Sequence, residues 1–183
     1  MPSKRVTIFC SSQTRPGELA YDQALHLGKL LALTGHTVIT GGYIGSMEAV
    51  SRGAAEAGGH VIGVTCEEIE RWRPVKANPW VHEEWRCATL RDRLGRMIDA
   101  CQAALALPGG PGTLTEIALT WNLLLTEAIA PRPLVLIGAG WQTTFEAFWQ
   151  AMGEYVPPNQ RQWLSFVEDI GSAVKALELR KKL

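Results

Sequence analysis

The sequence predicts an α/β fold with a doubly wound parallel sheet flanked by helices. Short apolar runs of strand length alternate with longer segments of helical periodicity along all 183 residues. Glycine-rich turns connect several of these strands to the helices that follow them. No linker, repeat or low-complexity tract interrupts the alternation, so residues 1–183 are expected to form a single Rossmann-like domain.

The first third of the chain contains three predicted strands and two helices. The strands are rich in β-branched and apolar residues and are expected at 5–10, 37–40 and 60–65. The helices have an apolar stripe at helical spacing and are expected at 18–34 and 46–57. Gly35 is expected to end the first helix in a left-handed conformation.

The middle of the chain is less regular. Residues 66–79 predict a surface loop with room for one short helical turn, and 80–86 is a weak strand candidate. An amphipathic helix is predicted at 88–101, with one buried face made of Leu90, Leu94, Met97, Ile98 and Cys101. Arg93 is expected at the border of that face, where a cation can extend over the core and reach a cleft.

The last part of the chain returns to regular alternation. Strands are predicted at 103–107, 134–137 and 163–167, and helices at 113–128, 141–152 and 169–182. The 113–128 helix is apolar on most sides and keeps one polar stripe of Thr113, Glu116 and Thr120. Such a helix is expected to be covered by the sheet and by a second subunit, which favours a homodimer. The 141–152 helix is expected to point Trp141, Phe145, Phe148 and Trp149 inward.

Composition excludes several classes of partner. Lys plus Arg and Asp plus Glu both number 18, so no basic excess favours nucleic acid or a membrane surface. The apolar runs are too short for a transmembrane helix. The four cysteines are scattered and form no C-x-x-C pair, which indicates buried free thiols in a cytoplasmic protein. No histidine or cysteine spacing suggests a metal site, and no cofactor is expected.

Two glycine turns follow predicted strands, at Thr40–Gly45 and Pro108–Gly112. In an open α/β sheet the ligand crevice lies at the carboxyl ends of the strands, near the point where strand order reverses. A helix N-terminus after a glycine turn offers free N–H groups to an anion, typically a phosphate. Neither turn has the lysine of a P-loop or the G-x-G-x-x-G pattern, which disfavours a kinase, an ATPase or a dehydrogenase.

Thr113 and Glu116 have a second interpretation. T-x-x-E is also the pattern of a capping box, in which the two side chains satisfy backbone N–H groups at a helix start. That pattern alone favours capping over catalysis. The three glycines and Pro111 directly before it favour an anion site, because a simple cap does not need them.

Residues 108–116 resemble the PGGxGTxxE motif of the LONELY GUY (LOG) family, also described as lysine decarboxylase-like. The resemblance covers most of the chain and includes Ile8–Ser12, Gly41–Met47, Ala57–Val64 and Thr120–Trp121. It implies a phosphoribohydrolase that cleaves the N-glycosidic bond of a nucleoside 5′-monophosphate. The substrates so implied are AMP or a cytokinin riboside monophosphate, whose cleavage activates the cytokinin, and no cofactor is implied.

The resemblance also assigns site residues. It makes Arg93 and Glu116 the catalytic pair, and we expect the helix N-terminus and Arg93 to keep Glu116 ionised. The residues expected to bind substrate or its phosphate are Gly109, Gly110, Gly112, Thr113, Gly41, Gly42, Gly45, Ser11 and Met97.

The chain departs from the family pattern at several positions. Leu94 replaces the lysine that usually follows the arginine, and Gln102 stands where aspartate is common. Thr40, Ser46 and Glu48 replace residues of the usual first glycine loop, and Glu48 would repel a phosphate if it faced the site. These departures keep two alternatives open: a non-catalytic nucleotide sensor or carrier of a phosphorylated cofactor such as molybdenum cofactor, and a purely structural oligomer. A pyridoxal-phosphate decarboxylase is disfavoured because no lysine follows a strand end of the predicted site.

Overall fold

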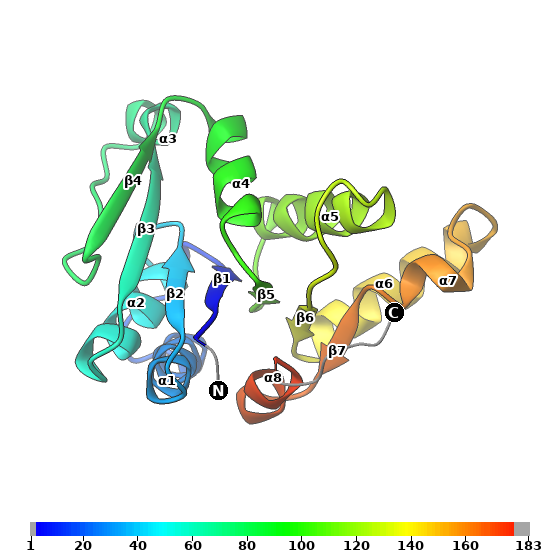
Figure 1. Ribbon diagram of the computed structural model, residues 1–183, viewed down its shortest axis with the longest axis horizontal. Helices are drawn as coiled ribbons and strands as arrows, with labels where there is room; N and C mark the ends of the chain where they lie inside the picture. The colour runs from blue at the N-terminus through cyan, green and yellow to red at the C-terminus, as the bar shows by residue number, and fades with distance from the viewer. Residues whose placement is uncertain (1–2, 178–183) are drawn as a thin grey trace.

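A seven-stranded sheet with the strand order β4-β3-β2-β1-β5-β6-β7 forms the centre of the molecule (Figure 1). The computed structural model describes residues 3–177. Every neighbouring pair of strands is parallel. The strands are β1 Arg5–Phe9, β2 Thr37–Thr40, β3 Val61–Cys66, β4 Glu83–Cys87, β5 Ala103–Ala106, β6 Leu134–Ile137 and β7 Ser165–Val167.

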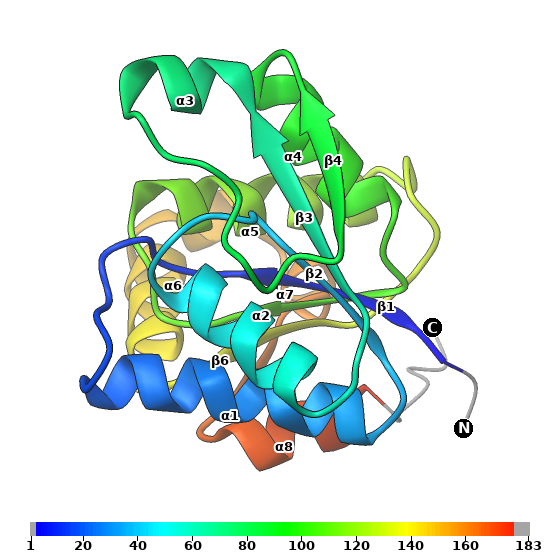
Figure 2. The same cartoon turned by 90° about the vertical axis from the view of Figure 1, so that its left-hand side faces the viewer.

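Helices cover both faces of the sheet, as a doubly wound fold requires (Figure 2). One apolar core lies between the sheet and α1 (Leu19–Leu33), α2 (Ser46–Glu56) and α8 (Ile170–Ala176). The other lies between the sheet and α4 (Leu90–Asp99), α5 (Pro111–Leu125) and α6 (Ala139–Met152). The short helices are α3 Glu67–Trp72, the 3₁₀ turn η1 Gly153–Tyr155 and α7 Pro158–Arg161.

The strand order reverses between β1 and β5. β1 pairs with β2 on one side and with β5 on the other, so the chain is wound outward in both directions from this pair. The turns after β1, β2 and β5 therefore meet at one edge of the sheet, where parallel folds bind ligands. Of the two glycine turns predicted from the sequence, Thr40–Gly45 follows β2 and Pro108–Gly112 follows β5.

The predicted α/β class and its order of elements are confirmed. β2 and β6 have the predicted bounds, and α2 begins at the predicted residue. Residues 67–72 form the short helix for which the predicted loop had room. Two expectations are wrong: the side chains of Leu90 and Phe148, predicted to point inward, are 44% and 42% exposed. The predicted 169–182 helix ends at Ala176 within the described residues, and 178–183 lie outside them.

Within residues 3–177 no helix is long and apolar enough to cross a bilayer.

α1 and α2 pack in close contact through two glycines. A Cβ atom built on Gly28 of α1 would lie 2.0 Å from the backbone oxygen of Val50. A Cβ atom on Gly53 of α2 would lie 1.9 Å from the backbone oxygen of Leu25. Each helix therefore needs a residue without a side chain at this crossing. The crossing fixes the position of α2, which begins directly after the first glycine turn.

We expect Gly28→Ala to lower the free energy of unfolding by about 2 kcal/mol or more, because α1 and α2 must move apart to accept the new methyl group. Gly95→Ala is the matched control: Gly95 also lies inside a helix, but a Cβ atom added to it would have nothing within 4 Å. This control should raise stability by about 0.5–1 kcal/mol, since alanine favours the helix. Urea unfolding followed by circular dichroism measures the free energy of unfolding of both variants. Equal changes in this free energy in Gly28→Ala and Gly95→Ala would contradict the close packing of α1 and α2.

Candidate active site at the reversal point of the sheet

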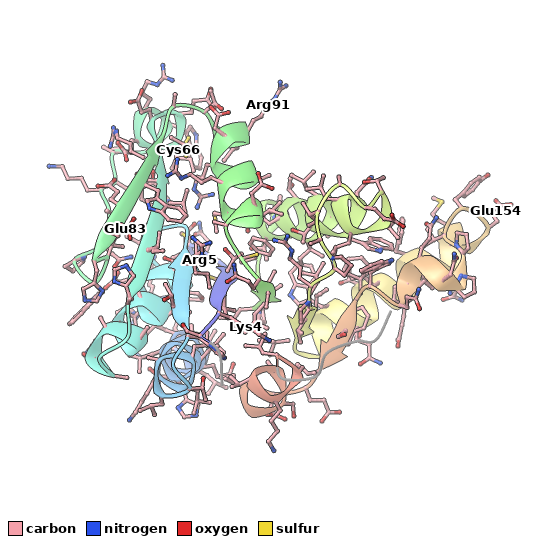
Figure 3. The ribbon with its side chains drawn as sticks, in the orientation of Figure 1. Lys4, Arg5, Cys66, Glu83, Arg91 and Glu154 are labelled. Carbon is pink, nitrogen blue, oxygen red and sulfur yellow. The ribbon has the colours of Figure 1, made fainter. Side chains whose placement is uncertain are left out.

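Arg93 is buried beneath the carboxyl ends of the strands. Its exposed fraction is 5%, whereas Arg91, two residues earlier on α4, points into solvent (Figure 3). The Nε atom of Arg93 donates a hydrogen bond of 2.8 Å to the backbone oxygen of Val64. The sequence placed Arg93 at the border of the buried face, and the structure places it inside. A guanidinium so deeply buried requires a partner with negative charge.

Glu116 on α5 is that partner. Its side chain belongs to the polar stripe that the sequence indicated, and the whole stripe of Thr113, Glu116 and Thr120 is buried. Arg93 Nη1 lies 3.6 Å from Glu116 Oε1, an ion pair slightly too long for a hydrogen bond. Arg93 and Glu116 come from α4 and α5, the helices that precede and follow β5 in the chain, and the fold brings the two side chains together as expected.

Burial changes the charge state of Glu116. Removal from water raises the pKa of its carboxyl from 4.5 to about 7, although the Arg93 guanidinium acts in the opposite direction. The expectation that Glu116 stays fully ionised is therefore corrected: desolvation outweighs the neighbouring charge. Among the described residues the Glu116 carboxyl group makes this ion pair and no hydrogen bond, so its oxygens can accept one from a water molecule or a substrate.

The capping-box interpretation is wrong. α5 begins at Pro111 with Gly110 as its N-cap, and no side chain caps it. Thr113 is therefore inside the first turn rather than before it, and its side chain is packed under Gly109, where a Cβ atom would lie 2.2 Å from Thr113 Oγ1. Pro111 starts the helix two residues earlier than the T-x-x-E pattern indicates, because its fixed φ suits the first helical position.

The uncapped start of α5 faces open space. Residues 108–112 are exposed, and nothing lies within 4 Å of a Cβ atom built on Gly110 or Gly112. The N–H groups of Gly112 and Thr113 have no carbonyl acceptor within the helix, since the first helical bond runs from Leu114 to Gly110. A cavity of about 200 Å³ lies on the α6 side of this turn, lined by Pro108, Gly109, Gly140, Trp141 and Thr144.

The first glycine turn is held against the end of β1. Gly45 has φ +75°, and a Cβ atom on it would lie 2.6 Å from the backbone of Ser12. The N–H group of Ser46 donates to the backbone oxygen of Ser11 at 2.9 Å. This position therefore requires glycine both for its conformation and for the approach of the β1 turn. Gly41, at the other end of the turn, lies against Arg93: a Cβ atom there would be 1.9 Å from Nη2.

Met97, predicted to bind substrate, and Glu48, which would repel a phosphate if it faced the site, both have contacts within the protein. Met97 is 1% exposed and packs in the core, and its backbone oxygen accepts a hydrogen bond from Thr7 Oγ1. A direct contact between Met97 and a ligand stays a prediction. Glu48 accepts a hydrogen bond of 3.4 Å from the hydroxyl of Tyr21 on α1, so this carboxylate is engaged by the helix that packs beside α2.

Three neighbours of the site were missed by sequence reasoning. Cys10 follows β1, and the pKa of its thiol is raised first by burial, then by the charge of Glu116, while Arg93 lowers it. Tyr43 places its ring 5.9 Å from the guanidinium carbon of Arg93. Asn78 binds the backbone of the first glycine turn. Their sequence signal was weak because each lies in a turn or loop whose partners are distant in the chain.

No group of three or more His, Cys, Asp or Glu side chains within residues 3–177 is arranged to hold a metal ion.

Comparison with known proteins identifies the family. The family model described as "Possible lysine decarboxylase" matches residues 47–177. A probable cytokinin riboside 5′-monophosphate phosphoribohydrolase of Oryza sativa subsp. japonica is 32% identical over an alignment of 181 positions, gaps included, that covers 96% of this chain and 78% of the relative. A protein of Arabidopsis thaliana named cytokinin riboside 5′-monophosphate phosphoribohydrolase is 32% identical over an alignment of 186 positions, gaps included, that covers 98% of this chain and 81% of the relative. The chain therefore belongs to the lysine decarboxylase-like, or LOG, family, whose relatives named here are hydrolases.

Solved structures confirm the fold. The molybdenum cofactor binding protein of Rippkaea orientalis has a TM-score of 0.74 at 21% identity, with 97% of both chains covered. The molybdenum cofactor carrier protein of Chlamydomonas reinhardtii has a TM-score of 0.71 at 22% identity, again with 97% of both chains covered.

We expect Glu116→Gln to stabilise the protein at about pH 8 by about 1–3 kcal/mol and to have little effect at about pH 5. The folded-state pKa of Glu116, about 7, lies above the ordinary 4.5, so between these values the folded protein binds more protons than the unfolded chain. Its stability consequently falls as pH rises through this window, and the amide removes that loss. Urea unfolding at the two pH values is the measurement. Equal destabilisation at both would show that the Glu116 side chain serves packing instead.

Proposed function

We propose that this protein is a nucleoside 5′-monophosphate phosphoribohydrolase that releases a free base and ribose 5-phosphate. The observation that carries the proposal is the buried Arg93–Glu116 pair beside the uncapped N-terminus of α5. Burying a charged pair is costly, and a site that needs a carboxylate in a water-poor setting gives a reason for it. AMP and cytokinin riboside monophosphates are the proposed substrates, in line with the names of the relatives.

The substrate's phosphate would bind at the start of α5. The free N–H groups of Gly112 and Thr113 and the positive end of the helix dipole suit a phosphate dianion. The glycines at 109, 110 and 112 leave the backbone accessible. Glu116, one turn further along the same helix, would then lie on the sugar side of the phosphate.

The reaction breaks the bond between C1′ of the ribose and the base nitrogen. Water supplies the oxygen that bonds to C1′, one of its protons passes to the departing base, and the transition state carries positive charge on the sugar. An ionised Glu116 would stabilise that charge and orient the water. Arg93 would hold the carboxylate in place and lower its pKa toward the range in which it is ionised at neutral pH.

A homodimer in the cytoplasm is also part of the proposal. α5 and α6 pack together through Trp121 and Phe145, whose ring centroids are 5.8 Å apart. The same two helices expose Leu114, Phe148 and Met152 by 41–48%. A second copy of the chain would cover these side chains. The four free cysteines suit a reducing compartment.

A carrier or sensor of a phosphorylated ligand is the second candidate. Leu94 favours it: this half-buried residue supplies no charge where the family usually has a lysine next to the arginine. On this alternative the α5 N-terminus would bind the ligand's phosphate, and Glu116 would not turn it over.

With AMP as substrate we expect adenine and ribose 5-phosphate in equal amounts, detected by chromatography. The rate should rise between about pH 6 and pH 8 as Glu116 ionises. Adenosine is the control substrate, and it should be cleaved at least about 100-fold more slowly because it lacks the phosphate that binds α5. Glu116→Gln should abolish release. Tight binding of AMP without release of base from any purine or cytokinin monophosphate would support the carrier and overturn the enzyme.

A further inference from the structure

Tyr43 is a fully buried residue of the first glycine turn with an anchored hydroxyl group. Its exposed fraction is 1%. The hydroxyl oxygen accepts a hydrogen bond of 2.6 Å from the N–H group of Cys66. The hydroxyl proton has two acceptors within reach, the Cys66 backbone oxygen at 3.1 Å and Glu70 Oε1 at 3.3 Å. Cys66 is the last residue of β3 (Figure 3). The Tyr43 hydroxyl is therefore bonded to the carboxyl end of this strand.

The same strand end also holds Arg93. Val64, two residues before Cys66, accepts the hydrogen bond from Arg93 Nε. The Tyr43 ring lies 5.9 Å from the guanidinium carbon, within the range of a cation–π contact. Gly41 lies against Nη2. The guanidinium is thus confined by a carbonyl, a ring and a glycine, and its Nη1 atom is left to pair with Glu116.

Two further sets of contacts keep the Tyr43 turn in place. Asn78 Nδ2 donates to the backbone oxygens of Gly42 and Tyr43 at 3.0 and 2.9 Å, and the Asn78 N–H group donates to Gly42 at 2.8 Å. On the hydroxyl side, Glu70 is bound by two nitrogens of Arg86 at 3.2 and 2.7 Å. These contacts link the loop before β4, the helix α3 and the first glycine turn into one support.

We propose that Tyr43 is a positioning residue that holds the Arg93 guanidinium opposite Glu116. This inference rests on the proposed function for its catalytic consequence, but the positioning itself is a property of the protein without substrate. Tyr43 touches neither the proposed reacting atoms nor the α5 N-terminus; it acts through Arg93.

A positioning role and a simple packing role differ in their effect on Glu116. The charged and titratable groups that act on Glu116 are Arg93 from α4 and Cys10 from the end of β1, and Arg93 favours the ionised carboxylate. If the guanidinium moves away, the carboxylate loses this support and its pKa rises. A loss of packing alone lowers stability and leaves that pKa unchanged.

The test is a titration of the Glu116 carboxyl carbon by ¹³C NMR in the full chain, with the resonance assigned by its loss in Glu116→Gln. Tyr43→Phe keeps the ring and removes the hydroxyl anchor, and Tyr43→Leu also removes the ring. Tyr21→Phe is the matched control: Tyr21 is 2% exposed, and its hydroxyl hydrogen bond goes to Glu48 rather than to the support of Arg93.

Tyr43→Phe should raise the pKa of Glu116 by about 0.5–1 and Tyr43→Leu by more, while Tyr21→Phe leaves it unchanged. With AMP, Tyr43→Phe should lower kcat at about pH 7 by about 3–10-fold with little change in KM. An unchanged titration in Tyr43→Phe, or an equal shift in Tyr21→Phe, overturns the positioning role. Absence of base release by the unaltered protein would overturn the proposed function instead, and the titration would still decide the role of Tyr43.

Discussion

The burial of one charged pair governs the arrangement of this molecule's candidate site. Arg93 and Glu116 are 5% and 7% exposed, so both groups lie away from water and each has the other as its partner of opposite charge. Three strands contribute to the surroundings of the pair: Val64 in β3 binds the guanidinium, Gly41 after β2 leaves room for it, and Cys10 after β1 lies close enough to interact with both charges. The parallel sheet makes this possible, because it collects the ends of β1, β2, β3 and β5 along one edge.

Within the pair, the attraction of Arg93 does not offset the desolvation of Glu116. Desolvation raises the pKa of Glu116 to about 7 in spite of Arg93, so at neutral pH the folded protein holds a carboxyl that is only partly ionised. A group kept so near its titration point is costly for stability and useful for chemistry in which charge develops on a sugar. The same reasoning explains why the guanidinium is confined on several sides: a small displacement of Arg93 changes the fraction of Glu116 that is ionised.

Much of the fold could be predicted from the sequence, because it depends on local patterns. The β-branched runs at 37–40 and 134–137 predicted strands, and the glycine turns predicted which edge of the sheet holds the candidate site. Arg93 and Glu116 could be named from the resemblance to a family motif, but the sequence did not predict that both side chains are buried. The periodicity of α4 put Arg93 at a border, since burial there depends on Tyr43 and Gly41, which are about 50 residues away in the chain. The T-x-x-E pattern misled because Pro111 starts α5 earlier. The role of Asn78 could not be predicted, because its contacts are with Gly42 and Tyr43, which are distant in the chain.

The central claim is that Arg93 and Glu116 act as one unit, and a double-mutant cycle tests it most directly. The measurement is kcat/KM for AMP in Arg93→Met, Glu116→Gln and the double variant, with unfolding curves to show that each remains folded. If the pair is the unit, the double variant loses no more activity than the worse single variant, so the two losses are far from additive. Losses that multiply, or near-normal activity in either single variant, would contradict the account.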